Sequence, residues 1–187
     1  MGIIGTGKIG SIVARILTAM GMRIIAYDPI ENLECINLGV EYMSIEQLFI
    51  ESNVISLHCP LNTKTKHLIG QSAIEKMKNG VMLINTSRGE ILDSSAVING
   101  IKSKKICYLG LDVYEQESDL FFRDLSCEII QDDVFERLLT LPNVLITAHQ
   151  VFFTSNALKN IADTTLNNIK LFGDGFDLST DVLIPKL

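Results

Sequence analysis

Three side chains in the second half of the sequence could together perform acid–base chemistry on a small anionic substrate. They are Arg88, Glu117 and His149, and each follows a run of residues typical of a β-strand. The runs are 81–87, 109–116 and 144–148. In an open parallel sheet, the carboxyl ends of the strands meet over one crevice, where ligands bind. A guanidinium that binds a carboxylate, an imidazole that donates a proton and a carboxylate that holds the imidazole are what the reduction of a 2-keto acid requires.

Strand and helix patterns alternate along the chain with short connections. Strands are predicted at 2–5, 23–27, 53–58, 80–85, 106–112 and 144–148, and helices at 8–20, 31–38, 45–51, 71–78, 93–101, 133–140 and 154–172. The continuous apolar run Val81-Met82-Leu83-Ile84 indicates burial on both faces and therefore a parallel sheet. With right-handed crossovers, the pattern predicts an α/β fold with a doubly wound parallel sheet of the Rossmann type. We expect a polar loop at 115–132 and an extended tail after Gly175.

The composition excludes several classes of partner. The 187 residues are 47% hydrophobic and 20% charged, which suits a sizeable core. Because the net charge is −6 and no basic stripe occurs, we expect no nucleic-acid partner. The four cysteines lie singly, without C-x-x-C or zinc spacing, which predicts reduced thiols, a cytoplasmic location and no metal site. Lys8 and Arg15 interrupt the apolar N-terminal stretch, so we expect neither a signal peptide nor a membrane partner.

A glycine fingerprint lies between the first predicted strand and the first predicted helix. The segment Gly5-Thr6-Gly7-Lys8-Ile9-Gly10 has the pattern G-x-G-x-x-G. Its first glycine allows a tight turn, its second lets the backbone approach a pyrophosphate, and its third lets the helix pack on the strand. The N–H groups and the dipole at the helix N-terminus favour an anion at this place. The segment therefore predicts a dinucleotide site.

Asp28 indicates which dinucleotide binds. It ends the second predicted strand, 18 residues after Gly10, close to the expected spacing of about 20. Its carboxylate would accept hydrogen bonds from the adenosine ribose and would repel a 2′-phosphate. Pro29 and Ile30 follow, with no arginine to hold a phosphate. The sequence therefore favours NAD over NADP as the cofactor.

Further residues at predicted strand ends could line the cofactor cleft. We expect His58, Cys59 and Pro60 to line the nicotinamide or ribose side through their backbone. Thr86 and Ser87 place two small hydroxyl side chains beside Arg88, and we expect both to contact the cofactor. Arg88 and His149 are also predicted to lie on the cofactor side. The remaining candidate is Asp112, whose carboxylate could bond the nicotinamide carboxamide. The alternative for Asp112 is a structural aspartate in a helix cap or a loop. For Cys59, the alternative is a catalytic nucleophile, which we favour less than the role of its backbone in lining the cleft.

These residues resemble the NAD-dependent D-isomer-specific 2-hydroxyacid dehydrogenases, and within that family the fermentative D-lactate branch. The matching segments are 2–10, 54–61, 85–89, 110–115, 119–122 and 149–154. The separations of 29 residues from Arg88 to Glu117 and 32 from Glu117 to His149 also match the family. The segment 129–139 and the pair Phe152-Phe153 favour the lactate branch, whereas Val151 departs from the alanine usual there.

The resemblance implies a division of the chain. Residues 1–150 would form the NAD-binding Rossmann domain, and 151–187 a helix and tail that in the family returns to the substrate domain. Members of the family carry a long segment before the glycine fingerprint, which here begins at residue 2. We therefore expect a truncated coenzyme domain with weak or no activity, since a one-walled cleft admits water and loses positioning.

The resemblance also implies roles for the three side chains. Arg88 would bind the carboxylate of pyruvate, His149 would protonate the carbonyl oxygen, Glu117 would hold the imidazole, and Phe152 would pack on the substrate methyl. NADH would supply the hydride. The alternatives are a dehydrogenase for another D-2-hydroxyacid, a non-catalytic NAD(H)-binding redox sensor and a gene fragment, although retention of all three side chains argues against a sensor. The oligomeric state stays open, a homo-oligomer included.

Overall fold

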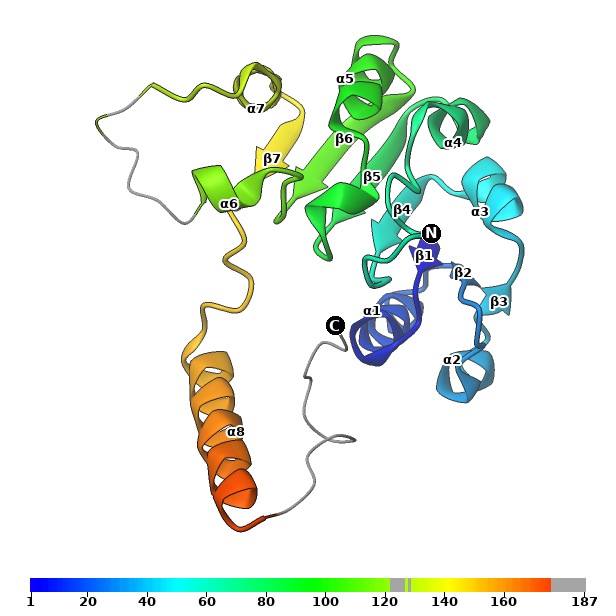
Figure 1. Ribbon diagram of the computed structural model, residues 1–187. Helices are drawn as coiled ribbons and strands as arrows, with labels where there is room; N and C mark the ends of the chain where they lie inside the picture. Colours follow the sequence, from blue (N-terminus) through cyan, green and yellow to red (C-terminus); the bar gives the residue numbers. More distant parts are fainter. Residues whose placement is uncertain (122–126, 128, 176–187) are drawn as a thin grey trace. The chain divides into compact units, whose positions relative to one another are not determined.

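The computed structural model describes residues 1–121, 127 and 129–175 (Figure 1). It divides into two compact units, 1–149 and 150–187, and each is described by itself. The expected extended tail after Gly175 lies outside the described residues.

The first unit is built on a sheet of seven parallel strands in the order β3-β2-β1-β4-β5-β6-β7. The strands are β1 (Gly2–Ile4), β2 (Ile25–Tyr27), β3 (Glu41–Tyr42), β4 (Val54–Leu57), β5 (Val81–Asn85), β6 (Ile106–Leu111) and β7 (Val144–Ile146). The order reverses between β1 and β4, which is the switch point of a doubly wound sheet. The predicted fold class is therefore confirmed. Strand β3 was not predicted, because two residues are too few to show an alternating pattern.

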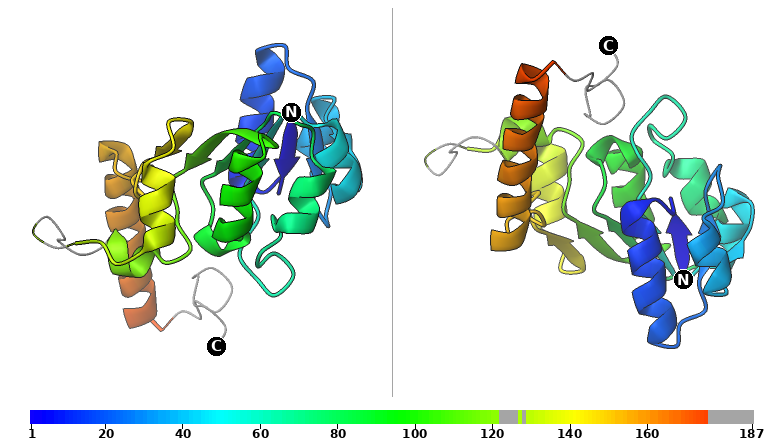
Figure 2. Two further views of the ribbon diagram at one scale, coloured as in Figure 1. Left: turned by 90° about the horizontal axis from the view of Figure 1, so that it is seen from above. Right: turned by 90° about the horizontal axis from the view of Figure 1, so that it is seen from below.

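Helices cover the sheet on two sides. The first unit contains α1 (Lys8–Ala19), α2 (Leu33–Asn37), α3 (Ile45–Glu51), α4 (Gln71–Lys76), the 3-10 helix η1 (Gly89–Ile91), α5 (Ser94–Lys102), α6 (Glu117–Leu120) and α7 (Asp133–Leu139). Helices α3, α4, α5 and α7 follow one another over one face, and α1 lies on the other (Figure 2). Side chains that accept a backbone N–H start four of these helices, as the sequence pattern of such caps predicts. These N-cap residues are Asn32, Ser44, Asp93 and Asp132.

The expectation of a polar loop throughout 115–132 was wrong in part. Helix α6 begins at Glu117 and ends at Leu120, one turn after β6. The signal was too weak to predict, since a single turn has no measurable apolar period. Its consequence is that Glu117 stands on a helical turn and not on an irregular loop.

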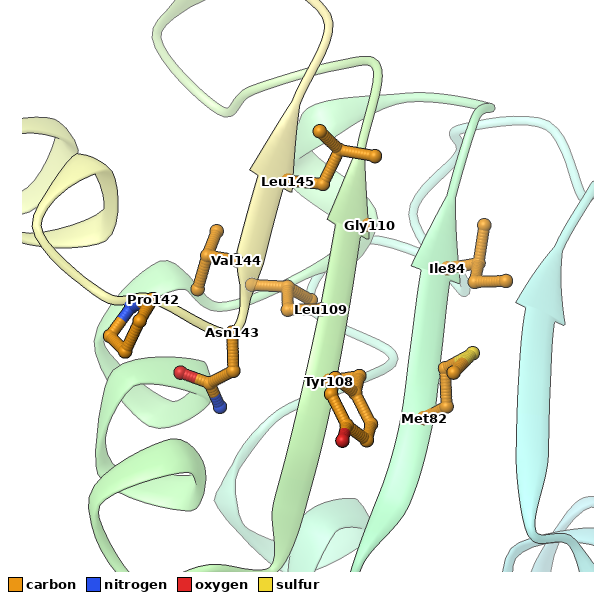
Figure 3. A pocket seen from close by; sticks show the side chains of 9 residues that line it. All are labelled: Met82, Ile84, Tyr108, Leu109, Gly110, Pro142, Asn143, Val144 and Leu145. Atoms are coloured by element: carbon orange, nitrogen blue, oxygen red, sulfur yellow. The ribbon is translucent and has the colours of Figure 1, made fainter.

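The two faces of the central strands differ in burial. Val81 and Leu83 of β5 are fully buried beneath α4 and α5. Met82 and Ile84 point to the other face, where with Tyr108 they border a hollow of ≈ 490 Å³ (Figure 3). Tyr108 is 58% exposed there. Within this unit, β5 is therefore buried on one face and half-buried on the other, so the prediction of burial on both faces was correct for one face. The parallel sheet that the same run indicated is present.

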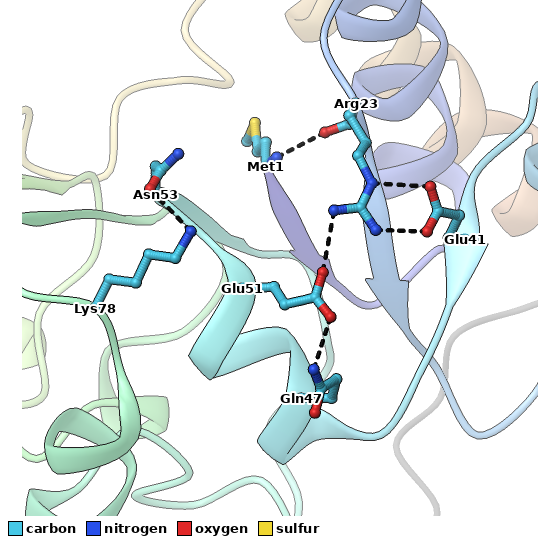
Figure 4. Close-up of polar contacts among 7 residues, drawn as sticks. All are labelled: Met1, Arg23, Glu41, Gln47, Glu51, Asn53 and Lys78. Atoms are coloured by element: carbon cyan, nitrogen blue, oxygen red, sulfur yellow. Dashed lines mark hydrogen bonds and ion pairs between the residues drawn. The ribbon is translucent and has the colours of Figure 1, made fainter.

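The amino-terminal edge of the sheet is held by exposed polar contacts (Figure 4). Arg23, just before β2, donates to Glu41 of β3 at 2.6 Å and to Glu51 of α3 at 3.0 Å. The Met1 ammonium donates to the Arg23 carbonyl at 2.7 Å. Ion pairs in water contribute little to stability. A ligand crevice is expected at the opposite edge, where the carboxyl ends of the strands meet beside the switch point.

The second unit contains one helix among its described residues, α8 (Ser155–Gly173). The Thr154 hydroxyl caps it by accepting the Ala157 N–H at 3.2 Å. Of the helices in the described part of the chain, none combines the length and apolar character that crossing a bilayer demands.

Candidate active site

The glycine fingerprint forms a tight turn between β1 and α1. Gly5 has φ = 93°, a conformation that side chains with a Cβ rarely adopt. A Cβ at Gly10 would overlap the Gly5 carbonyl oxygen, so α1 packs directly on the turn. A Cβ at Gly7 would meet nothing within 4 Å, and no side chain caps the helix start there. The turn therefore leaves an open space facing the α1 N-terminus, where an anion is favoured.

Asp28 is fastened to this turn. Its Oδ2 accepts the Thr6 N–H at 2.7 Å and the Thr6 hydroxyl at 3.3 Å, while Oδ1 accepts the Ile30 N–H at 3.0 Å. A carboxylate can accept about four hydrogen bonds. These three leave room for a further donor on Oδ1, and the half-buried carboxylate also lines a cavity.

Two residues that the sequence analysis missed brace the same turn. The Tyr42 hydroxyl donates to the Thr6 hydroxyl oxygen at 2.8 Å and accepts the Asn32 N–H at 3.0 Å. The Asn32 side chain donates to the Thr6 carbonyl at 2.8 Å. Asn32 was detectable only as a helix cap, and Tyr42 lies on the unpredicted β3. Thr6, at 2% exposure, is thus surrounded by side chains distant in sequence.

We predict that Tyr42→Phe weakens NADH binding by about 3–10-fold, because the turn loses the hydrogen bond that the Tyr42 hydroxyl donates to Thr6, worth roughly 1 kcal/mol. Titration of NADH followed by fluorescence measures the change. Tyr108→Phe is the matched control, since Tyr108 lies on the open sheet face away from the turn. Equal affinities in the two variants would show that the Tyr42 hydroxyl does not support the turn.

A cavity of ≈ 410 Å³ opens beside the turn and Asp28. Six of the predicted cofactor residues line it: Gly5, Gly7, Asp28, His58, Cys59 and Pro60. The other predicted residues of the fingerprint surround the turn without lining the cavity: Thr6, Lys8, Ile9 and Gly10.

The strand ends beside this cavity are polar. His58 lies with Nε2 2.9 Å from the Ser56 hydroxyl, and burial lowers the pKa of its imidazole, which favours the neutral ring. The Ser87 hydroxyl donates to the Cys59 carbonyl at 2.6 Å and so joins the end of β5 to the end of β4. Thr86 is exposed next to it. The residues predicted around the cleft therefore share one edge of the sheet.

Cys59 is a poor nucleophile in this setting. Burial raises the pKa of its thiol to about 11, so the thiolate that would react is scarce at pH 8. We predict that iodoacetamide at pH 8 alkylates the exposed Cys127 much faster than Cys59, as mass spectrometry of the peptides would measure. Comparable rates would contradict the burial of Cys59.

His149 and Glu117 form a pair at the carboxyl ends of β7 and β6. Nδ1 of His149 lies 3.0 Å from Oε1 of Glu117, and the side chains are 28% and 19% exposed. Oε2 of Glu117 accepts the Tyr114 N–H at 3.1 Å, which fixes the carboxylate. The pairing predicted from spacing is thus present in the geometry.

Asp112 supports the turn that carries His149. Its Oδ1 accepts the Thr147 hydroxyl at 2.5 Å, and its backbone carbonyl accepts the His149 N–H. Ala148 and His149 both have positive φ, at 53° and 56°, which costs energy in residues other than glycine. Asp112 is 4% exposed and does not line the 410 Å³ cavity. Its role toward a nicotinamide stays a prediction.

Arg88 follows β5 directly and is exposed, with Nη1 donating to the Ser87 carbonyl at 2.7 Å. The next residue, Gly89, packs against the 114–115 backbone so closely that a Cβ would overlap the Tyr114 carbonyl. The Arg88 segment and the turn that holds Glu117 are therefore in direct contact. Because β5, β6 and β7 are neighbours, the structure brings all three predicted side chains to one edge.

Phe152 belongs to the second unit. Its predicted contact with the substrate methyl therefore stays a prediction.

Comparison with known proteins identifies the family of this fold and site. Residues 1–150 match the model of the D-isomer specific 2-hydroxyacid dehydrogenase, NAD binding domain. The chain belongs to this family. The resemblance stated from the motifs is confirmed, and with it NAD as the cofactor of the domain.

Relatives within the D-isomer-specific 2-hydroxyacid dehydrogenase family are close. D-lactate dehydrogenase of Escherichia coli K12 is 55% identical over 168 residues, which are 90% of this chain and 51% of that protein. The structure described as the pyruvate reductase of Chlamydomonas reinhardtii has a TM-score of 0.91 at 43% identity, over 95% of this chain and 54% of that one. D-lactate dehydrogenase of Aquifex aeolicus, complexed with NAD and lactic acid, has a TM-score of 0.87 at 38% identity, over 93% and 53%. The chain spans about half the length of these relatives.

Proposed function

We propose that the chain provides the coenzyme-side half of an active site that interconverts pyruvate and D-lactate with NAD(H). The observation that carries the proposal is the His149–Glu117 pair at 3.0 Å, on the same sheet edge as Arg88 and the glycine turn. An acid–base pair alone fits many reactions. Its combination with a guanidinium and a dinucleotide turn fits the reduction of a 2-keto acid.

The residues around the 410 Å³ cavity fit NAD. Gly7 leaves open space at the α1 N-terminus for the pyrophosphate, and Asp28 retains capacity for a ribose hydroxyl. When bound, NADH supplies the hydride that adds to the substrate carbonyl carbon. The Thr6–Asp28 hydrogen bonds keep the carboxylate in place before the cofactor arrives.

The three predicted side chains divide the work on the substrate. Arg88 would bind the substrate carboxylate through two parallel N–H bonds and orient the keto group. The Glu117 carboxylate holds Nδ1 of His149, so the proton that is transferred to the carbonyl oxygen lies on Nε2. The Tyr114 N–H holds the other oxygen of Glu117, which keeps the carboxylate directed at the imidazole.

The names of the relatives favour lactate and pyruvate as the substrate pair. One relative is described as a pyruvate reductase, and another was solved with lactic acid.

We further assign 1–150 to the NAD-binding domain and 151–187 to a helix and tail that belongs with a substrate domain. Another D-2-hydroxyacid is the alternative substrate, decided by residues that such a domain contributes.

We predict that the 187-residue chain binds NADH more tightly than NADPH, and that Asp28→Ala weakens NADH binding by about 10-fold or more. The substitution removes the carboxylate that would accept the ribose hydroxyl and that holds Thr6 in place. The lost hydrogen bonds are worth roughly 1–3 kcal/mol of binding free energy. Isothermal titration calorimetry measures both affinities. Asp174→Ala, at the end of α8, is the matched control. An unchanged NADH affinity in Asp28→Ala would refute the assigned cofactor site.

A further inference from the structure

The outer wall of the cofactor cavity is a short loop, residues 60–69, called here the rim loop. It contributes Pro60, Asn62, Lys64, Thr65 and Leu68 to the cavity lining. The loop is braced from within, because the Asn62 side chain accepts the Lys64 N–H at 2.8 Å and the Thr65 hydroxyl donates to the Pro60 carbonyl at 2.6 Å. These internal hydrogen bonds hold the loop in one shape, and its far end is attached to the rest of the sheet edge by further contacts.

His67 attaches that end. Its backbone N–H donates to the Glu90 carbonyl at 2.8 Å, and Nε2 lies 2.6 Å from Oε1 of Glu115. His67 has φ = 50°, a strained value for a residue with a Cβ. These two contacts come from separate segments of the chain, and with the bond from the Ile69 N–H to the Ile91 carbonyl at 3.1 Å they hold His67 in this conformation.

Glu115 makes a second contact on the opposite oxygen. Its Oε2 accepts the hydroxyl of Ser94, the first residue of α5, at 3.1 Å. Glu115 also follows Tyr114, whose N–H holds the Glu117 carboxylate. The backbone that joins Tyr114 to Glu115 lies against Gly89, and Gly89 is the residue that follows Arg88. The half-buried Glu115 carboxylate thus joins the rim loop to the start of α5, and the Glu115 backbone belongs to the turn beneath the His149–Glu117 pair.

We propose that Glu115 is a positioning residue that joins the rim loop of the cofactor cavity to the turn carrying Glu117, and so couples cofactor binding to the orientation of the His149 imidazole. The role rests on the proposed function and adds a connection to it. Glu115 itself does not line the cavity.

The test compares Glu115→Gln with Lys78→Gln. Lys78 lies at the amino-terminal edge of the sheet, where its ammonium donates to the Asn53 side chain at 3.3 Å, a contact that involves neither the rim loop nor Glu115. The first readout is the imidazole NMR signal of His149 in the chain without cofactor, assigned by His149→Gln. The second is the NADH dissociation constant. Ser94→Ala, which removes one neutral donor from Glu115, repeats both measurements in case Glu115→Gln does not fold.

We expect Glu115→Gln to shift the His149 imidazole signals and to weaken NADH binding by about 3–10-fold, while Lys78→Gln changes neither. His67→Gln should weaken binding similarly, and the double variant should be no weaker than Glu115→Gln alone, because both remove one connection. Unaltered His149 signals in Glu115→Gln would overturn the proposal, whatever the affinity. If the unaltered chain does not bind NADH, the proposed function fails, and the His149 signals still decide whether Glu115 positions the turn.

Discussion

Replacing Gly10 with alanine is expected to weaken NADH binding at least about 100-fold, on the order of 3 kcal/mol. The added Cβ would occupy the position of the Gly5 carbonyl oxygen, and backbone atoms cannot rotate away as a side chain can. Either α1 must move off the sheet or the turn must open. Both changes displace the N–H groups at the α1 N-terminus from the place where the pyrophosphate is expected.

Calorimetric titration of NADH measures this loss, and a thermal melt shows how much of it reflects unfolding. Gly173→Ala is the matched control, because a Cβ there meets nothing within 4 Å and the residue lies at the end of α8. An affinity within threefold of the unaltered chain in Gly10→Ala would mean that the cofactor does not bind at this turn.

The second large effect is expected at Arg88. In a hybrid enzyme, the 168 aligned residues of this chain replace the matching segment of the E. coli relative, which supplies the rest of the fold. Arg88→Lys in the hybrid is expected to lower kcat/KM for pyruvate by at least about 100-fold. A lysine ammonium cannot reproduce the planar, two-point contact of a guanidinium with a carboxylate.

The loss of kcat/KM should be much larger than any change in NADH affinity, because Arg88, although predicted to lie on the cofactor side, does not line the 410 Å³ cavity. Arg23→Lys is the control substitution, since Arg23 lies at the opposite, amino-terminal edge of the sheet. Equal losses in both variants would indicate a general effect on the fold and would refute the assigned role of Arg88.

The sheet and the positions of the candidate site residues along its edge could be predicted because their signals are local or repeat regularly. Apolar strands alternating with helical patterns indicate a parallel sheet, and the chain must then bring Arg88, Glu117 and His149 to one edge. The glycine spacing and Asp28 carried the cofactor prediction in the same way. Each of these inferences needed only the order of elements and the side-chain type.

The supporting contacts could not be predicted, because they join residues far apart in sequence. Tyr42 reaches Thr6 across 36 positions from a strand of two residues, and Glu115 reaches His67 across 48. Neither pair has a local pattern. The positive φ of His149 was equally hidden, since glycine is the usual signal for that conformation.

Two expectations failed for a related reason. A polar stretch does not reveal a single helical turn such as α6, which forms where the Glu117 carboxylate can accept the Tyr114 N–H. An apolar run such as the one in β5 indicates that side chains on both faces of the sheet are apolar and are stabilised by burial. It does not reveal which segment covers the face formed by Met82 and Ile84, which within the first unit is only half-buried.

The most direct test of the central claim is pyruvate-dependent oxidation of NADH by the hybrid enzyme, followed by absorbance, beside its His149→Gln variant. We expect turnover in the hybrid and a loss of at least about 100-fold in the variant, because the proton donor is removed while the residues that line the 410 Å³ cavity are unchanged. A folded hybrid that binds NADH but does not oxidise it with pyruvate, or whose turnover is unaffected by His149→Gln, would contradict the proposed function.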